Sequence, residues 1–167
     1  MAIVSATIAN KGNMMNPYII KEIKSGDSKK ILFAAKPVDM ERAIKAKTAI
    51  QIKRMMEDVM ISGTGKDVRK IYFETSRYTT SPQSRGSASI RVAGKTGTAE
   101  VGDKNGNGKT DPDEKPHSWF IGFAPADNPK IAIAVIAENQ GFGSLTAAPI
   151  AMDVLAEALN AGNKKSY

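Results

Sequence analysis

Three parts of the chain are compatible with helices, and two of them carry apolar residues at helical spacing. Residues 1–10 are rich in Ala and Ile, and Gly12 and Asn13 follow where a helix would end. Residues 48–61 place apolar side chains on one face and most charged ones on the other. Residues 146–159 form another amphipathic stripe, with a proline in the first turn, where a helix tolerates it. These patterns predict three helices.

The second and third of these helices are expected to bury one face each. In the second, the face is Met-rich, which favours core packing over a ligand site; its residues are Ile52, Met55, Met56, Val59 and Met60. In the third, the face is aliphatic and consists of Ala147, Ile150, Ala151, Val154, Leu155, Ala158 and Leu159.

Shorter apolar runs predict strands. Residues 18–23 and 30–34 flank a Ser-Gly-Asp-Ser turn, which indicates a β-hairpin. Residues 91–101 and 118–124 predict two more strands. The last run, 131–137, is apolar on both faces, which is typical of a strand inside a sheet that is covered on both sides.

The order of these elements indicates an α+β fold. One helix, a hairpin, a second helix, three strands and a final helix favour helices packed on a largely antiparallel sheet. Residues 66–90 show no clean period and predict a loop or an insertion. Residues 102–117 are expected to connect two strands, and the whole chain, 1–167, is expected to belong to one domain.

Composition narrows the class of protein. No apolar run approaches the roughly 20 residues that span a bilayer, so the chain is expected to be soluble, without an anchor or a signal peptide of its own. The absence of cysteine excludes disulfides and thiolate metal sites. The net charge of +7 is uneven, because residues 42–95 are basic and residues 101–139 are slightly acidic. A basic region of this kind is more often a solvated surface than a binding site for nucleic acid.

The candidate chemistry centres on Lys95-Thr96-Gly97-Thr98. This tetrad resembles the Lys-Thr-Gly box of penicillin-binding proteins and serine β-lactamases. The apolar strands at 119–125 and 131–137 follow it at the expected spacing, and Ala-Pro-Ile-Ala opens the final helix. Over most of the chain, apart from 66–90, the sequence resembles the C-terminal part of the transpeptidase domain of class B, high-molecular-mass penicillin-binding proteins.

The resemblance implies a D,D-transpeptidase that cross-links peptidoglycan stem peptides by serine acyl transfer and is trapped by β-lactams. In that chemistry, Lys95, Thr96 and Thr98 would face the substrate carboxylate, because an anion needs a cation and hydrogen-bond donors. Gly97 would let the substrate backbone approach closely. The backbone N–H of Thr98 would be one of the two oxyanion donors, and no cofactor would be required.

The family's nucleophile is absent from this sequence. No serine is followed by Lys at the third position or by Asn at the second, so neither the Ser-x-x-Lys box nor the Ser-x-Asn box is present. The chain alone is therefore expected to be inactive, and its expected partner is the missing N-terminal half of the domain. Surfaces that this half would cover are expected to favour self-association. The resemblance also places the parent protein outside the cytoplasm, anchored to the cell membrane.

Residues 103–114 match the calcium-loop pattern D-x-[DN]-x-[DN]-G-x₅-E. Gly108 stands where that loop turns sharply, and the oxygen ligands would come from Asp103, Asn105, Asn107, Lys109 (through its carbonyl), Asp111 and Glu114. Strands rather than helices are expected to flank the loop, unlike in an EF-hand. The alternative is a polar connection whose Asn-Gly and Asp residues simply favour turns.

Two other functions are weighed against the transpeptidase. A non-catalytic binding module derived from the same fold would recognise cell-wall peptide or a division partner. A nucleic-acid binder would use the basic region with Tyr72, Phe73 and Tyr78, but this interleaving is sparse, and no nucleic-acid partner is expected. A phosphate loop at 103–110 is rejected, because Asp103 occupies the position that requires the first glycine.

Overall fold

The computed structural model describes residues 1–27, 29–69, 90–103, 105–109 and 111–163. In chain order the elements are α1 (Ala2–Ala9), β1 (Asn13–Met15), β2 (Glu22–Lys24), β3 (Ile31–Ala34), β4 (Asp39–Arg42), α2 (Ala46–Ile61), α3 (Lys66–Arg69), β5 (Ala93–Ala99), the 3₁₀ turn η3 (Pro112–Glu114), β6 (His117–Ala124), β7 (Ile131–Ala137) and α4 (Ala147–Asn163). No described helix is both long and apolar enough to cross a membrane.

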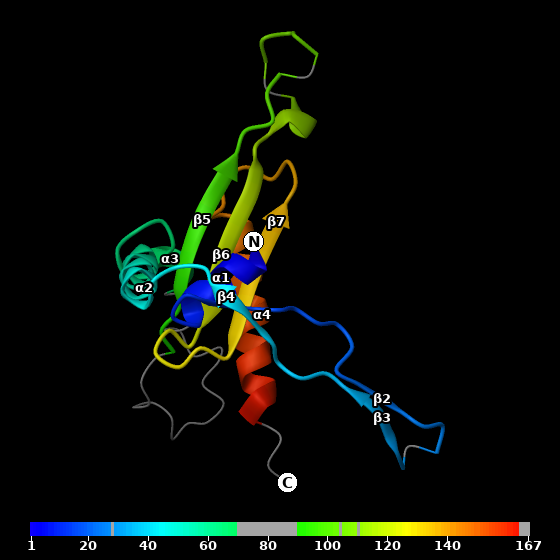
Figure 1. Ribbon diagram of the computed structural model, residues 1–167. Coiled ribbons are helices and arrows are strands. Elements are labelled where there is room, and N and C mark those ends of the chain that lie inside the picture. The colour runs from blue at the N-terminus through cyan, green and yellow to red at the C-terminus, as the bar shows by residue number, and fades with distance from the viewer. Residues whose placement is uncertain (28, 70–89, 104, 110, 164–167) are drawn as a thin grey trace.

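A three-stranded antiparallel sheet in the order β5-β6-β7 forms the centre of the molecule (Figure 1). Phe120 and Phe123 of β6 are fully buried on opposite faces of this sheet. On the Phe120 face the core includes Met60 of α2 and Met152 of α4. On the Phe123 face it includes Ile8 of α1. Helices α1 and α4 therefore cover opposite faces, and α2 lies beside β5.

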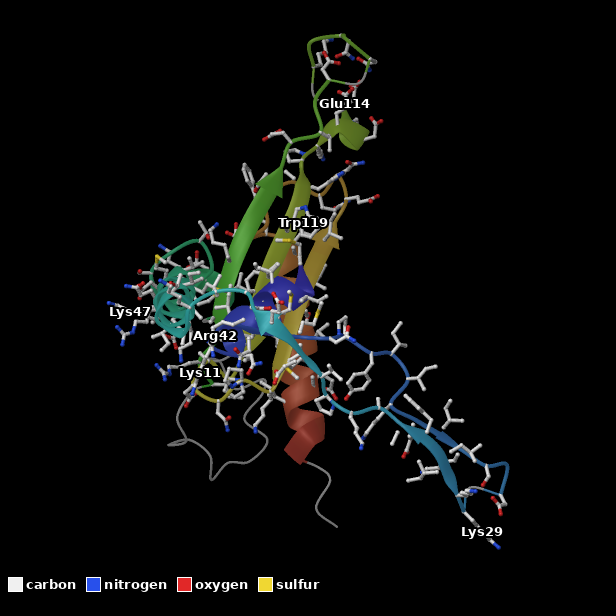
Figure 2. The ribbon with its side chains drawn as sticks, in the orientation of Figure 1. Lys11, Lys29, Arg42, Lys47, Glu114 and Trp119 are labelled. Atoms are coloured by element: carbon white, nitrogen blue, oxygen red, sulfur yellow. The ribbon has the colours of Figure 1, made fainter. Side chains whose placement is uncertain are left out.

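Two short strand pairs leave this body. β1 pairs with β4 next to α1, and β2 pairs with β3 in a hairpin that projects away from the sheet, with Lys29 at its tip (Figure 2). Both hairpin strands are exposed along their whole length. Exposed apolar side chains are therefore concentrated on this hairpin and the segment before it; they include Tyr18, Ile19, Ile20, Ile23, Ile31, Leu32 and Phe33.

The α+β class, the antiparallel sheet and the three long helices are confirmed. Helix α1 ends as predicted, since Gly12 has a φ of +90° and donates its N–H to the carbonyl of Thr7 at 2.8 Å. The hairpin is also confirmed, but β2 begins only at Glu22, where a partner residue on β3 becomes available. The predicted strand at 91–101 shortens to β5 for the same reason, because its pairing with β6 runs from Ala93 to Ala99.

Three predictions about packing need correction. Strand β7 has helices on both faces, as expected, but it lies at an edge of the described sheet and is only partly buried. Met55 on α2 is 59% exposed, because the buried face of that helix is narrower than the apolar stripe. In α4, Ile150 and Val154 are 43% and 47% exposed, whereas Met152 is fully buried in their place.

The predicted loop at 66–90 is also partly wrong. Residues Lys66–Arg69 form the short helix α3, and Val68 on it is 6% exposed and belongs to the core. Residues 70–89 lie outside the described residues, as do Tyr72, Phe73 and Tyr78. Strand β5 ends at Ala99 and β6 begins at His117, so His117 belongs to the strand and not to the connection predicted at 102–117.

Candidate functional site

Lys95 lies in the middle of β5 and is exposed to solvent. It pairs with Ile121 of β6, so the two side chains share the face of the sheet on which α1 packs. The ammonium group donates a hydrogen bond to the backbone carbonyl of Thr96, with an Nζ–O distance of 2.6 Å. Among the described residues it forms no ion pair with a carboxylate, so its charge is available to an anionic ligand.

Thr96 and Thr98 point to the opposite face of β5 from Lys95, because side chains alternate along a strand. The Thr96 side chain is almost buried, with 8% of the residue exposed, and its hydroxyl lies 2.6 Å from the hydroxyl of Thr64. Thr98 is exposed and pairs with Ser118 of β6. Residues 95–98 of the strand therefore carry one cation on one face and two hydroxyls on the other.

Gly97 pairs with Trp119, and the two backbones leave little room between them. A Cβ atom on Gly97 would lie 3.2 Å from the Cβ of Trp119, which is tighter than ordinary packing. Together with Lys95 and Ile121, these residues line a hollow of about 330 Å³ beside the strand. Lys95 thus faces this hollow beside Ile121 and Trp119, while the hydroxyl of Thr96 is directed to Thr64 on the other face of the strand.

The loop between β7 and α4 supports this strand, and sequence reasoning missed it. Gly143 is buried against the backbone, since a Cβ there would collide with the carbonyl oxygens of Gly97 and Trp119. The hydroxyl of Ser118, fully buried, donates to the carbonyl of Phe142 at 3.1 Å and accepts the N–H of Ala147 at 3.0 Å. These contacts fix the loop and the start of α4 against the centre of the sheet.

His117, the only histidine, has a structural contact: its Nδ1 accepts the backbone N–H of Asn139 at 3.0 Å. This bond joins the start of β6 to the segment that follows β7. Nothing in its described contacts places it near Lys95 as a general base.

The calcium-loop candidate forms a tight turn beyond the end of the sheet, with Glu114 at its base (Figure 2). The carboxylate of Asp103 accepts backbone N–H groups from Gly106 at 2.6 Å and from Gly108 at 2.7 Å. The N–H of Asn107 also points to it, at 3.3 Å. Gly108 has a φ of +72°, as the sharp turn at this position requires. Asp103 is thus held in the position that the first ligand of such a loop takes.

The other candidate ligands bond to one another. The side-chain amides of Asn105 and Asn107 donate to one oxygen of Asp111, at 2.7 and 3.0 Å, and Glu114 accepts the N–H of Asp111 at 3.0 Å. Within the described residues, no three acidic or histidine side chains gather as a metal would require. The two amides would have to rotate before their oxygens faced a cation.

The backbone hydrogen bond from Gly108 is the largest cause that holds the pKa of Asp103 below its ordinary value, with those from Gly106 and Asn107 adding to it. A carboxyl with a lowered pKa in the folded state stabilises that state above its ordinary pKa and loses this effect as the pH falls through the lowered value.

Comparison with known proteins identifies the family of this chain. The family model described as penicillin binding protein transpeptidase domain matches residues 1–156. The peptidoglycan D,D-transpeptidase PbpA of Mycolicibacterium smegmatis is 34% identical over 166 residues, which are 96% of this chain and 28% of that protein. Stage V sporulation protein D of Bacillus subtilis is 34% identical over 95% of this chain and 22% of its own length.

Solved structures show the same fold. The D,D-transpeptidase domain of a peptidoglycan glycosyltransferase from Eggerthella lenta superposes with a TM-score of 0.71 at 29% identity, covering 96% of this chain and 31% of that one. Penicillin-binding protein A of Mycobacterium tuberculosis, as its imipenem acyl-enzyme complex, gives 0.65 at 32% identity, covering 95% of this chain and 29% of that one.

The fold is that of a penicillin-binding protein transpeptidase domain. The chain belongs to the penicillin-binding protein transpeptidase domain family, and its relatives are class B members of that family. It spans between about a fifth and a third of the length of the relatives and structures named above.

Proposed function

We propose that these residues supply the Lys-Thr-Gly half of a D,D-transpeptidase site that cross-links peptidoglycan stem peptides and binds β-lactams. The observation that carries the proposal is the arrangement on β5: an exposed ammonium that forms no ion pair with the described residues, on the same strand as the hydroxyls of Thr96 and Thr98. Such a set suits a peptide that ends in a carboxylate. A β-lactam with its own carboxylate would bind in the same way.

In this proposal, the chain binds and orients the substrate but does not attack it. Lys95, Thr96 and Thr98 hold the terminal carboxylate, and Gly97 gives the substrate backbone room to lie along the strand. A serine from a Ser-x-x-Lys segment attacks the D-Ala-D-Ala carbonyl and expels the terminal D-Ala as the acyl-enzyme forms. The amine of a second stem peptide then replaces the serine. The backbone N–H of Thr98 would stabilise the oxyanion in both steps.

A chain that joins these residues to a Ser-x-x-Lys segment is a complete transpeptidase. We propose that this segment is the principal partner of residues 1–167, and that the complete transpeptidase works outside the cytoplasmic membrane, anchored to it. Covalent labelling by a fluorescent penicillin tests the function. The complete transpeptidase should keep the label through denaturation, and residues 1–167 alone should not acquire it.

The second candidate is a binding module that uses the same strand without chemistry. It would bind a peptide ending in D-Ala-D-Ala, or a division partner, and would release it unchanged. Reversible binding by a complete transpeptidase that never forms an acyl-enzyme would favour the module over the enzyme.

We also propose that the loop at 103–114 binds Ca²⁺, supported by the three N–H groups that fix the Asp103 carboxylate. Millimolar Ca²⁺ should raise the melting temperature of the chain, because a ligand that binds only the folded state stabilises it. The Asp103→Asn variant should lose this shift, whereas Asp127→Asn, in the exposed turn after β6, should retain it. Isothermal titration without heat at millimolar Ca²⁺ would leave the loop as a structural turn.

Self-association is a further proposal, supported by the exposed apolar side chains of the β2–β3 hairpin. Light scattering on residues 1–167 should give a mass above that of the 17.9 kDa monomer, and the Phe33→Ser variant should lower it. Phe33 suits this test because it is 48% exposed, so its replacement leaves the core intact. A monodisperse monomer at high protein concentration would contradict the proposal.

A further inference from the structure

We propose that Thr64 is a positioning residue that orients the hydroxyl of Thr96 toward the carboxylate of the bound substrate or β-lactam. The inference rests on the proposed function and adds to it a residue outside the Lys-Thr-Gly tetrad. Its basis is the contact between the two hydroxyl oxygens, which lie 2.6 Å apart although the residues are 32 positions apart in sequence.

Thr64 is held in place by the turn that ends α2. The N–H of Gly63 donates to the carbonyl of Asp58 at 3.1 Å, and that of Gly65 donates to Val59 at 3.0 Å. A Cβ on Gly63 would lie 2.8 Å from the Cα of Val59, so this position favours glycine. The turn therefore folds tightly onto the last turn of α2 and presents the Thr64 side chain to β5 at a fixed place.

The direction of the hydroxyl–hydroxyl bond decides what Thr96 can offer a ligand. A hydroxyl carries one proton and accepts through two lone pairs. If Thr96 donated to Thr64, its proton would be used, and its oxygen would face an anion with lone pairs only. If Thr64 donates to Thr96, the Thr96 proton remains free for a carboxylate. An anionic ligand therefore selects the order Thr64 to Thr96 to carboxylate, in which each bond strengthens the next.

Lys95 also forms a hydrogen bond with the backbone of Thr96. The ammonium donates to the Thr96 carbonyl at 2.6 Å, while the Thr96 hydroxyl faces Thr64. Because only 8% of Thr96 is exposed, its side chain has little freedom to find another orientation. Both the ammonium of Lys95 and the hydroxyl of Thr64 therefore contact Thr96, the first at its backbone carbonyl and the second at its side chain.

The test compares variants of the complete transpeptidase with penicillin G and with its methyl ester, which has no anionic carboxylate. Thr64→Val keeps the shape and removes the hydroxyl, and Thr64→Ser keeps the hydroxyl. With penicillin G, Thr64→Val should lower the second-order acylation rate about three- to tenfold, the effect of one lost hydrogen bond. The loss should lie in the binding constant rather than in the limiting rate, and Thr64→Ser should recover most of it.

With the methyl ester, Thr64→Val and the wild type should react at the same rate. Thr48→Val makes the same change on an exposed residue at the other end of α2, and it should leave both rates unchanged. The inference is overturned if Thr64→Val slows the acid and the ester equally, or slows neither. A wild-type complete transpeptidase that no penicillin acylates would instead overturn the proposed function itself.

Discussion

Replacing Lys95 by glutamine should slow acylation of the complete transpeptidase by β-lactams on the order of 100-fold. Lys95 has no carboxylate partner among the described residues, and in the empty site its ammonium donates to the neutral carbonyl of Thr96. A bound carboxylate would instead lose a charge-assisted hydrogen bond, and a 100-fold change corresponds to about 3 kcal/mol. Stopped-flow acylation with a chromogenic cephalosporin measures it.

The control for this variant is Lys130→Gln, which makes the same change in the exposed turn before β7. It should leave the acylation rate within about twofold of the wild type, because the effect of a distant surface charge is screened by salt. A Lys95→Gln variant that reacted as fast as Lys130→Gln would show that Lys95 does not hold the ligand's carboxylate.

Replacing Gly143 by alanine should destabilise the chain by about 2–3 kcal/mol, a large effect for the addition of one methyl group. The new Cβ would collide with the carbonyl oxygens of Gly97 and Trp119, which are backbone atoms of two paired strands. These atoms cannot move aside without disturbing the sheet. The expected fall in melting temperature is about 5–10 °C.

Thermal unfolding followed by circular dichroism measures this fall, and Gly26→Ala is the matched control. Gly26 lies in the hairpin turn, where an added Cβ would meet nothing within 4 Å, so that variant should melt with the wild type. If Gly143→Ala melted with Gly26→Ala, the loop after β7 would not support the Lys-Thr-Gly strand as described.

The elements with a regular period were predictable because one physical requirement dominates each of them. Helices α2 and α4 each bury one side and strands β5, β6 and β7 form the sheet between the helices, whereas α1 was predictable only from its Ala-rich composition, since it buries Ser5 and Thr7. The buried face of α4 was harder to predict, since Ala148, Met152 and Ala156 are as apolar as the residues of the predicted face. Because the apolar sector of this helix is wide, packing against the sheet decides which part of it is buried. Met152 is fully buried, whereas Ile150 is exposed.

Less of the site could be predicted, because its supports are defined by contacts between distant segments. The Lys-Thr-Gly tetrad is contiguous and could be recognised in the sequence. In the sequence, Thr64 is part of a Ser-Gly-Thr-Gly segment that is typical of a turn after a helix. Its contact with Thr96 arises from the packing of α2 beside β5, which no local pattern predicts. Ser118 bonds to Phe142, and Gly143 packs against Gly97 and Trp119, only because the loop after β7 folds onto the sheet. The repeated Gly-x-Gly at 141–143 was the one local signal of a close backbone approach.

The central claim is that β5 is half of a penicillin-reactive site and needs a serine from another segment. Intact-protein mass spectrometry after incubation with penicillin G tests it most directly. The complete transpeptidase should gain the mass of one penicilloyl group, and residues 1–167 alone should gain none under the same conditions. A covalent adduct on residues 1–167 alone, or an unmodified complete transpeptidase, would contradict the account.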